Sequence, residues 1–278
     1  MVFRYNVLAQ TKGGDQNSVV MLGAHSDSVD AGPGINDDGS GTVAILELAR
    51  QLASFKVKQS IRFGWWSGEE EGLLGSNYYV ASLSPEETKK VKLYLNFDMI
   101  ASPNFQYGIF DGDGKTFNIS GPQGSSDIEK LFQDWFDSNH LNWTASEFDG
   151  RSDYDAFIKA GIPAGGLETG AEVNKTAKGV AQFGGQEGVA FDKNYHSAGD
   201  NVANLNMTAF LVNAKGIAHA IGTYAVSLDS IKFNTTEPQS SVVRRKTGTS
   251  LKAGNPRGHT NTKRKITPLR HSHWRRAF

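Results

Sequence analysis

The sequence contains no cysteine. This absence excludes a disulfide framework, thiolate metal ligands and a cysteine nucleophile. No apolar run approaches the roughly 20 residues that a membrane-spanning helix needs. The first residues, MVFRYNVLAQT, lack the charged, apolar and small-residue regions of a signal peptide. A G-x-x-x-x-G-K-S/T phosphate loop is also missing, which argues against a phosphate-handling enzyme. We therefore expect a globular protein with no membrane partner.

Negative charge is missing from one end of the chain, although the formal net charge is zero. Residues 240–278 contain eleven Lys or Arg and no Asp or Glu, so residues 1–239 hold all twenty-nine acids against the other eighteen basic residues. The basic end has little apolar periodicity. We predict a globular domain over residues 1–238 and a basic, disordered tail over residues 239–278. Such a tail suits nucleic acid or anionic lipid, but a solvated extension explains it more simply, and we expect neither partner.

Apolar runs of strand length alternate with a helical pattern in the acidic part of the chain. The runs are SVVMLGAH (18–25), SIRFGWWSG (60–68) and VKLYLNFDMI (91–100), and GTVAILELARQLASF (41–55) predicts a largely buried helix. This alternation indicates an α/β domain with a substantially parallel sheet.

Further segments are predicted by their capping and turn residues. Helices are expected over residues 125–140, 152–160 and 206–227, with Ser152 as the N-cap of the second and Gly161 as its stop. GGLETGAE (165–172) is expected to form a loop beside a substrate cleft, because glycines allow close backbone approach.

Acidic side chains gather where the predicted strands end. GAHSDSVDAGPGINDDGSG (23–41) follows the first strand, Glu69 to Glu71 follow the second, and Asp98 closes the third. The carboxyl ends of parallel strands meet at one crevice, so these groups are expected to converge. Burying such carboxylates without a counter-ion would cost several kcal/mol each, roughly. The pattern therefore predicts a bound cation.

Histidine mixed with carboxylates and no sulfur suits zinc, or less selectively manganese, cobalt or iron, whereas calcium and magnesium sites seldom use imidazole. A single catalytic zinc needs only about three protein ligands and water. The chain offers more acids than that. Two metals that share a bridging carboxylate would use the surplus.

Six segments together resemble the co-catalytic dizinc aminopeptidases, most closely those of the aminopeptidase Y or secreted leucine aminopeptidase type. They are GAHSDSV, GPGINDDGSG, WWSGEEEGLLGSNYYV, NFDMI, GRSDYDAF and DKNYHSAGDNVANLN, within a resemblance that spans residues 5–228. The resemblance implies the zinc-dependent exopeptidase fold, a three-layer α/β/α arrangement with a mixed, largely parallel central sheet. It also implies a metallo-exopeptidase that hydrolyses the N-terminal peptide bond by means of a hydroxide bridging two zinc ions.

The resemblance assigns a role to each matching residue. The implied ligands of the two zinc ions (Zn2+) are His25 and Asp98 for one, Glu70 and His196 for the other, and Asp37 as the bridge. Glu69 is implied as the general base, and Tyr195 as the phenol that supports the tetrahedral intermediate. Two zinc ions, three ligand carboxylates and one hydroxide balance to zero charge, which supplies the positive charge that the acidic clusters lack.

Neighbouring polar residues have roles outside metal ligation. The resemblance implies that Asp27 accepts a hydrogen bond from the His25 ring, that Arg151 orients the substrate, and that Asp153 supports the metal ligands. A plain helix start explains part of the Arg151–Asp153 pattern equally well. Asp200 is a candidate buttress of the His196 region. Glu71 and Asp38 are expected to be solvated or supporting groups rather than ligands.

The start of the chain departs from the resemblance. Relatives carry helices and a protease-associated domain ahead of the RYNVLAQT strand, and we expect these to be absent. Five N-glycosylation sequons favour a secreted or vacuolar glycoprotein, against which the missing signal peptide counts; they begin at Asn118, Asn142, Asn174, Asn206 and Asn234.

The expected substrate is a peptide with a free N-terminus and an apolar or otherwise broad first residue, and the expected state is a monomer. A dizinc carboxypeptidase and a nonenzymatic receptor-type domain of the same fold remain alternatives. The second is disfavoured because Glu69 and every implied ligand are present.

Overall fold

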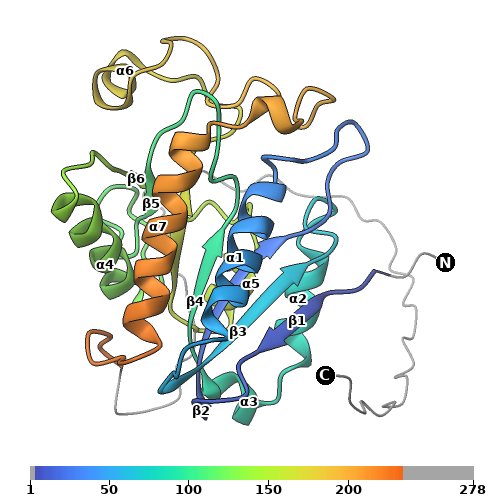
Figure 1. Cartoon of the computed structure of the whole chain (residues 1–278), viewed down its shortest axis with the longest axis vertical. Helices are drawn as coiled ribbons and strands as arrows, with labels where there is room; N and C mark the ends of the chain where they lie inside the picture. The colour runs from blue at the N-terminus through green and yellow to red at the C-terminus, as the bar shows by residue number, and fades with distance from the viewer. Residues whose placement is uncertain (1–3, 234–278) are drawn as a thin grey trace, which may run out of the picture. The chain divides into compact units, whose positions relative to one another are not determined.

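A seven-stranded sheet forms the centre of the computed structural model, which describes residues 4–233 (Figure 1). Its strands are β1 (Val7–Gln10), β2 (Asp15–His25), β3 (Gln59–Trp66), β4 (Val91–Phe97), β5 (Gly108–Phe110), β6 (Thr144–Ser146) and β7 (Ala164–Glu168). They lie in the order β1-β3-β2-β4-β7-β5-β6. The pairs β1/β3 and β5/β7 are antiparallel and the other neighbours are parallel. The mixed, largely parallel sheet is as predicted.

Helices cover both faces of the sheet, which gives the predicted three layers. One apolar cluster joins the strands to α1 (Gly39–Leu52), α4 (Ser125–Ser138) and α7 (Met207–Tyr224). A second cluster joins the opposite face to α2 (Leu74–Ser82) and α5 (Tyr154–Lys159). Figure 1 shows α1 and α7 side by side in front of the sheet. The remaining helices are α3 (Pro85–Lys90), α6 (Ala177–Phe183) and the short 3-10 helix η1 (Val202–Asn204).

Strand β2 shows why these apolar runs form the centre of the sheet. Val20 and Leu22 belong to the first apolar cluster and Met21 to the second. Side chains alternate between the faces of a strand, so a continuous apolar run fills both layers at once. All three side chains are fully buried.

Some local expectations were wrong. The helix predicted over residues 41–55 is α1, but Val43 and Leu46 are each 55% exposed, so it is only half-buried. Residues 164–168 form β7, so only the second half of the predicted loop 165–172 is a loop. Ser152 does not cap α5: the N-cap is Asp153. Gly161 does follow the end of α5, with a φ of 79°.

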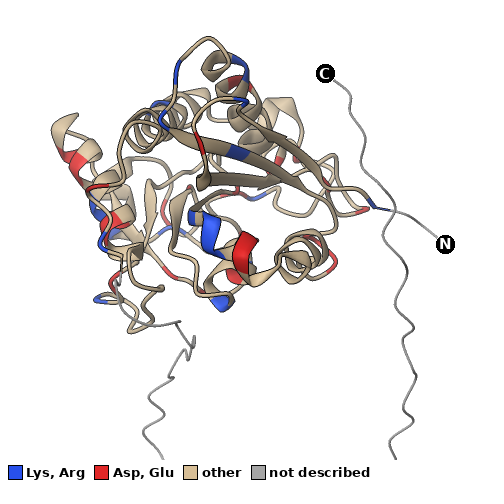
Figure 2. Ribbon diagram, turned by 90° about the horizontal axis from the view of Figure 1, so that it is seen from below, with Lys and Arg blue, Asp and Glu red and all other residues tan. Residues whose placement is uncertain are grey.

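Acidic and basic residues are interspersed over the fold rather than gathered by sign (Figure 2). In α3, Glu86 and Glu87 lie in the first turn and Lys89 and Lys90 in the last, an order that complements the helix dipole. Within residues 4–233, no helix is long and apolar enough to cross a bilayer. The predicted basic tail, residues 239–278, lies outside the described residues, as does the sequon at Asn234.

Candidate metal centre

Four segments that are distant in the sequence carry the predicted metal ligands to one place. His25 is the last residue of β2, Asp37 lies two residues before the start of α1, and Asp98 follows β4. Glu70 lies in the turn after β3, and His196 lies between α6 and η1. The strands end at the same edge of a parallel sheet, which is why their polar ends meet.

The Asp37 carboxylate lies between two groups of candidate ligands. Its Oδ1 is 3.0 Å from His25 Nε2, which in turn is 3.4 Å from Asp98 Oδ1. Its Oδ2 is 3.1 Å from His196 Nε2, which is 2.9 Å from Glu70 Oε2. Ligands that surround a tetrahedral zinc at about 2.0–2.2 Å are about 3.3–3.5 Å apart. The spacing of each group therefore fits a metal ion with little adjustment.

Several buried oxygens of this cluster lack a hydrogen bond. They include Glu70 Oε1 and Asp98 Oδ1. An ionised carboxylate only accepts hydrogen bonds, and leaving a buried acceptor unpaired costs about 1–3 kcal/mol, or more when it is charged. Coordination of cations would satisfy these oxygens. The donor set therefore fits a pair of zinc ions.

The pKa values of these carboxylates also indicate that the cluster has too few positive charges. Burial raises the pKa of Glu69 to about 9 and that of Glu70 to about 7. Burial also acts to raise the pKa of Asp37, but hydrogen bonds from His196 and His25 outweigh it and lower the pKa to about 2. The cluster holds more carboxylates than its own cations can neutralise.

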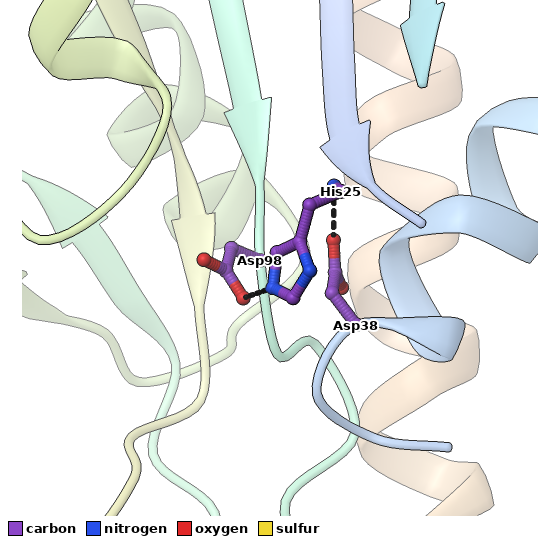
Figure 3. Close-up of side chains that lie close together, drawn as sticks. All are labelled: His25, Asp38 and Asp98. Atoms are coloured by element: carbon purple, nitrogen blue, oxygen red, sulfur yellow. Dashed lines mark hydrogen bonds and ion pairs between the residues drawn. The ribbon is translucent and has the colours of Figure 1, made fainter. Parts of the chain in front are cut away.

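Asp38 lies beside the candidate ligands, but its carboxylate is hydrogen-bonded to the main chain. Its carboxylate accepts from three main-chain nitrogens, those of His25 at 3.1 Å, Gly41 at 2.9 Å and Met99 at 3.1 Å. Figure 3 shows the His25 ring turned toward Asp98 while the His25 main-chain nitrogen is bound by Asp38. Asp38 thus ties together the ends of β2 and β4 and the start of α1.

Asp27 contacts the His25 ring through its main-chain oxygen. The His25 Nδ1 atom lies 3.0 Å from the main-chain oxygen of Asp27 and 3.7 Å from its Oδ1. The carboxylate instead accepts from the main-chain nitrogen of Glu69 at 3.1 Å. The carbonyl therefore orients the imidazole, and the side chain holds the turn that carries Glu69 and Glu70.

Two further groups fix the ligands in place. Asp200 was a candidate buttress of the His196 region, but its carboxylate accepts from the main-chain nitrogens of Asn36 at 2.8 Å and Asp37 at 3.0 Å and so holds the backbone at Asp37. The Ser152 hydroxyl donates to Asp98 Oδ2 at 2.6 Å and accepts from Asn96 Nδ2 at 2.8 Å. The sequence alone suggested only a helix cap for Ser152, because its partner comes from another strand.

A cavity of ≈ 510 Å³ opens beside the candidate ligands, and Glu69, Glu70, Arg151 and Tyr195 line it. The Tyr195 ring stacks on His196, and Arg151 Nη2 donates to the Tyr195 hydroxyl oxygen at 3.3 Å. Asp153 does not line this cavity. It is 1% exposed, and its Oδ1 has no hydrogen bond.

Comparison with known proteins gives the family. The profile of peptidase family M28 matches residues 6–221. A protein of Aspergillus oryzae named "probable leucine aminopeptidase 2" is 60% identical over 233 residues, which cover 84% of this chain and 47% of the relative. Leucine aminopeptidase 2 of Arthroderma otae is 59% identical over 224 residues, which cover 81% of this chain and 45% of the relative. The chain spans about half the length of the curated relatives it matches.

Solved structures show the same fold. A zinc aminopeptidase from Bacillus subtilis superposes with a TM-score of 0.65 at 25% identity, covering 82% of this chain and 51% of the other. An aminopeptidase from Aneurinibacillus sp. strain AM-1 superposes with a TM-score of 0.63 at 27% identity, covering 86% and 50%. The fold prediction is confirmed, and the chain belongs to peptidase family M28.

Proposed function

We propose that this chain is the catalytic domain of a metallo-aminopeptidase that hydrolyses the N-terminal peptide bond of peptides with two zinc ions per chain. The position of Asp37 carries the proposal. Its Oδ1 lies 3.0 Å from His25 Nε2 and its Oδ2 lies 3.1 Å from His196 Nε2, so one carboxylate is shared by two ligand groups. Similarity to proteins named leucine aminopeptidase and zinc aminopeptidase supports the same reaction.

The proposed metal positions follow the two ligand groups. One ion would be held by His25 and Asp98, the other by Glu70 and His196, and both by Asp37. Bound zinc supplies a Lewis acid for the scissile carbonyl and lowers the pKa of water toward about 7. All of these side chains come from one chain, so the proposed site is complete within a monomer, which is the state we propose. Asp153 is proposed as a buried negative charge behind these ligands.

Glu69 is the proposed general base. It is 8% exposed, it lines the cavity beside Glu70, and its main-chain nitrogen is fixed by Asp27. From there its carboxylate would take a proton from the attacking water and deliver it to the leaving nitrogen. Proton transfer by a positioned side chain contributes about 10²–10⁴-fold to the rate.

Tyr195 is the proposed donor to the oxyanion that develops during attack. Its ring is held against His196, with ring centroids 3.8 Å apart and planes at 22°. Arg151 donates to the hydroxyl oxygen, so the Tyr195 O–H stays free to donate into the cavity. Arg151 is itself fixed by Glu172 Oε1 at 2.8 Å, which leaves it at the cavity wall to orient substrate.

The reaction and its metal dependence are tested together with Leu-p-nitroanilide. The purified full chain is expected to release p-nitroaniline, to lose more than about 90% of this activity with a chelator, and to regain it with zinc, because no described side chain can replace the Lewis acid. Acyl dipeptides with a free carboxyl end are expected to stay intact. Activity that survives complete metal removal, or cleavage of the acyl dipeptides instead, would contradict the proposal and favour another reaction.

A secreted or vacuolar location is proposed from the sequons. Three of their asparagines are exposed in the described part of the chain: Asn118, Asn142 and Asn174. Asn206 differs, because its side chain caps α7. Its Oδ1 accepts from the main-chain nitrogens of Thr208 and Ala209, each at 3.1 Å, and its Nδ2 donates to the Pro103 carbonyl at 3.3 Å.

Glycan mapping tests which of these sequons can be modified, on chain secreted by a eukaryotic host with an added signal peptide. Asn118 is expected to be modified, because it lies exposed in a left-handed turn with a φ of 59°. Asn206 is expected to be largely bare because its amide is engaged. Glycosidase treatment in heavy-oxygen water followed by peptide mass spectrometry reads each site. A modified Asn206 beside a bare Asn118 would contradict this assignment.

A further inference from the structure

A carboxylate with no metal-binding role lies in the wall of the cavity. Glu168 is the last residue of β7 and lines the same cavity as Asp98. In the parallel ladder Phe97 pairs with Leu167, so Asp98 and Glu168 occupy the next position on the two neighbouring strands. Glu168 therefore lies one strand away from Asp98, at the edge of the sheet that carries the candidate metal ligands.

The surroundings of Glu168 hold its carboxylate in one position. Oε1 accepts from Gln106 Nε2 at 2.8 Å and from the Ser146 hydroxyl, and Oε2 accepts from the main-chain nitrogen of Gly170. Gly108 lies opposite Glu168 in the antiparallel ladder, and a Cβ at that position would overlap the carboxylate. The absence of a side chain at Gly108 thus makes the room that Glu168 occupies.

The Glu168 carboxylate has no cationic partner within residues 4–233: no ion pair joins it to Lys, Arg or His there. Burial raises its pKa despite the hydrogen bonds from Ser146 and Gln106, and the charge of Asp149 acts in the same direction. A carboxylate accepts about four hydrogen bonds, and three donors contact this one. It retains capacity for a further donor, and a positive one would offset its loss of hydration.

The cavity that Glu168 lines also has apolar side chains in its walls. Met99, Phe117, Phe183 and Phe191 also line the cavity. Lys and Arg side chains bury their methylene stems along apolar surface and place the charge at a polar tip. The lining also carries other carboxylates, Glu147, Asp149 and Glu172 among them, against the cations Arg151 and Lys178. A cavity with aromatic side chains and an excess of carboxylates suits such a side chain, whereas a purely apolar residue would leave Glu168 without a cationic partner.

We propose that Glu168 determines specificity for the first residue of the substrate by pairing with the cationic side chain of an N-terminal Lys or Arg. This inference rests on the proposed aminopeptidase function and names a substrate class for it. Leucine and other apolar residues would enter the same cavity without that pairing.

The test compares lysine with norleucine, which has an unbranched apolar side chain, in the full chain and in Glu168→Gln. The ratio of kcat/KM for the two p-nitroanilides is measured on one preparation, so the fraction of active protein cancels. Glu168→Gln is expected to lower the lysine-to-norleucine ratio by at least about tenfold, because a hydrogen bond to a charged group is lost. Glu187→Gln is the matched control: it removes an exposed acid from the loop after α6, outside the cavity lining, and should leave the ratio as it is.

Calorimetric titration with lysinamide and norleucinamide gives a second reading without turnover. The affinity ratio is expected to shift by the same factor in Glu168→Gln. If the chain hydrolyses no anilide but shows this shift, the aminopeptidase proposal fails and the assignment of Glu168 stands. A lysine-to-norleucine ratio that Glu168→Gln leaves unchanged overturns the assignment. The same unchanged ratio is expected if Glu168 binds the α-amino group, because lysine and norleucine both carry that group.

Discussion

Replacing Glu69 by Gln is expected to lower kcat for Leu-p-nitroanilide by about 10²–10⁴-fold while two zinc ions per chain remain bound. Glutamine has the shape of glutamate but cannot accept the proton of the attacking water. The Glu69 carboxylate makes no hydrogen bond to the described residues, so its replacement should leave the fold intact. Steady-state kinetics beside metal analysis of the same sample measure both effects.

Glu71→Gln is the matched control, because it makes the same change two residues away. The Glu71 carboxylate is exposed and pairs with Arg4, and it does not line the cavity. Exposed ion pairs contribute about 0–1 kcal/mol to the free energy of unfolding, so the loss of this one should leave the fold intact. The activity of Glu71→Gln should therefore stay within about twofold of that of the unchanged chain. Equal losses in the two variants, or full turnover in Glu69→Gln with normal metal content, would contradict the role of Glu69.

The apolar runs predicted the strands that carry the site, and the rule for parallel sheets predicted that their polar ends would meet. The run 18–25 ends at His25 in β2, and Asp98 follows β4 as expected. A buried run of this kind leaves few alternatives, since it must be covered on both faces. The short strands β5 and β6 have three residues each, which is too few to show any periodicity.

Contacts between distant segments could not be predicted in the same way. Ser152 was interpreted as a helix cap, yet its hydroxyl donates to Asp98 at 2.6 Å, because the start of α5 packs beside the end of β4. Asp27 was expected to accept from the His25 ring, but the sequence did not show which of its oxygens would do so, and the carbonyl lies closer than the carboxylate. A hydroxyl or carboxylate forms hydrogen bonds with whichever groups the fold brings near. The local sequence does not show which groups these are. The general place of the site was therefore predictable and its supporting hydrogen bonds were not.

The adjacent residues Asp37 and Asp38 are expected to differ in their effect on zinc content when each is replaced by Asn. Asp37→Asn removes the charge shared by both ligand groups, so zinc content should fall to one ion per chain or fewer. Its kcat/KM should fall by more than about 100-fold, because even groups that only orient metal ligands typically cost 10–100-fold. The metal-free protein should also lose some stability, because the His25 and His196 rings lose the carboxylate whose pKa their hydrogen bonds lower to about 2. Metal analysis and urea unfolding of the metal-free chain measure the two properties.

Asp38→Asn makes the same chemical change at a carboxylate that binds three main-chain nitrogens. An amide offers only one oxygen, so its NH₂ group must face at least one of these donors. An unpaired buried donor costs about 1–3 kcal/mol, and the free energy of unfolding should fall by that amount while both zinc ions stay bound. Loss of zinc from Asp38→Asn without loss of stability, together with two ions retained by Asp37→Asn, would exchange the roles of the two residues. The position of Asp37, 3.0 and 3.1 Å from two separate imidazoles, would then not reflect a role in metal binding.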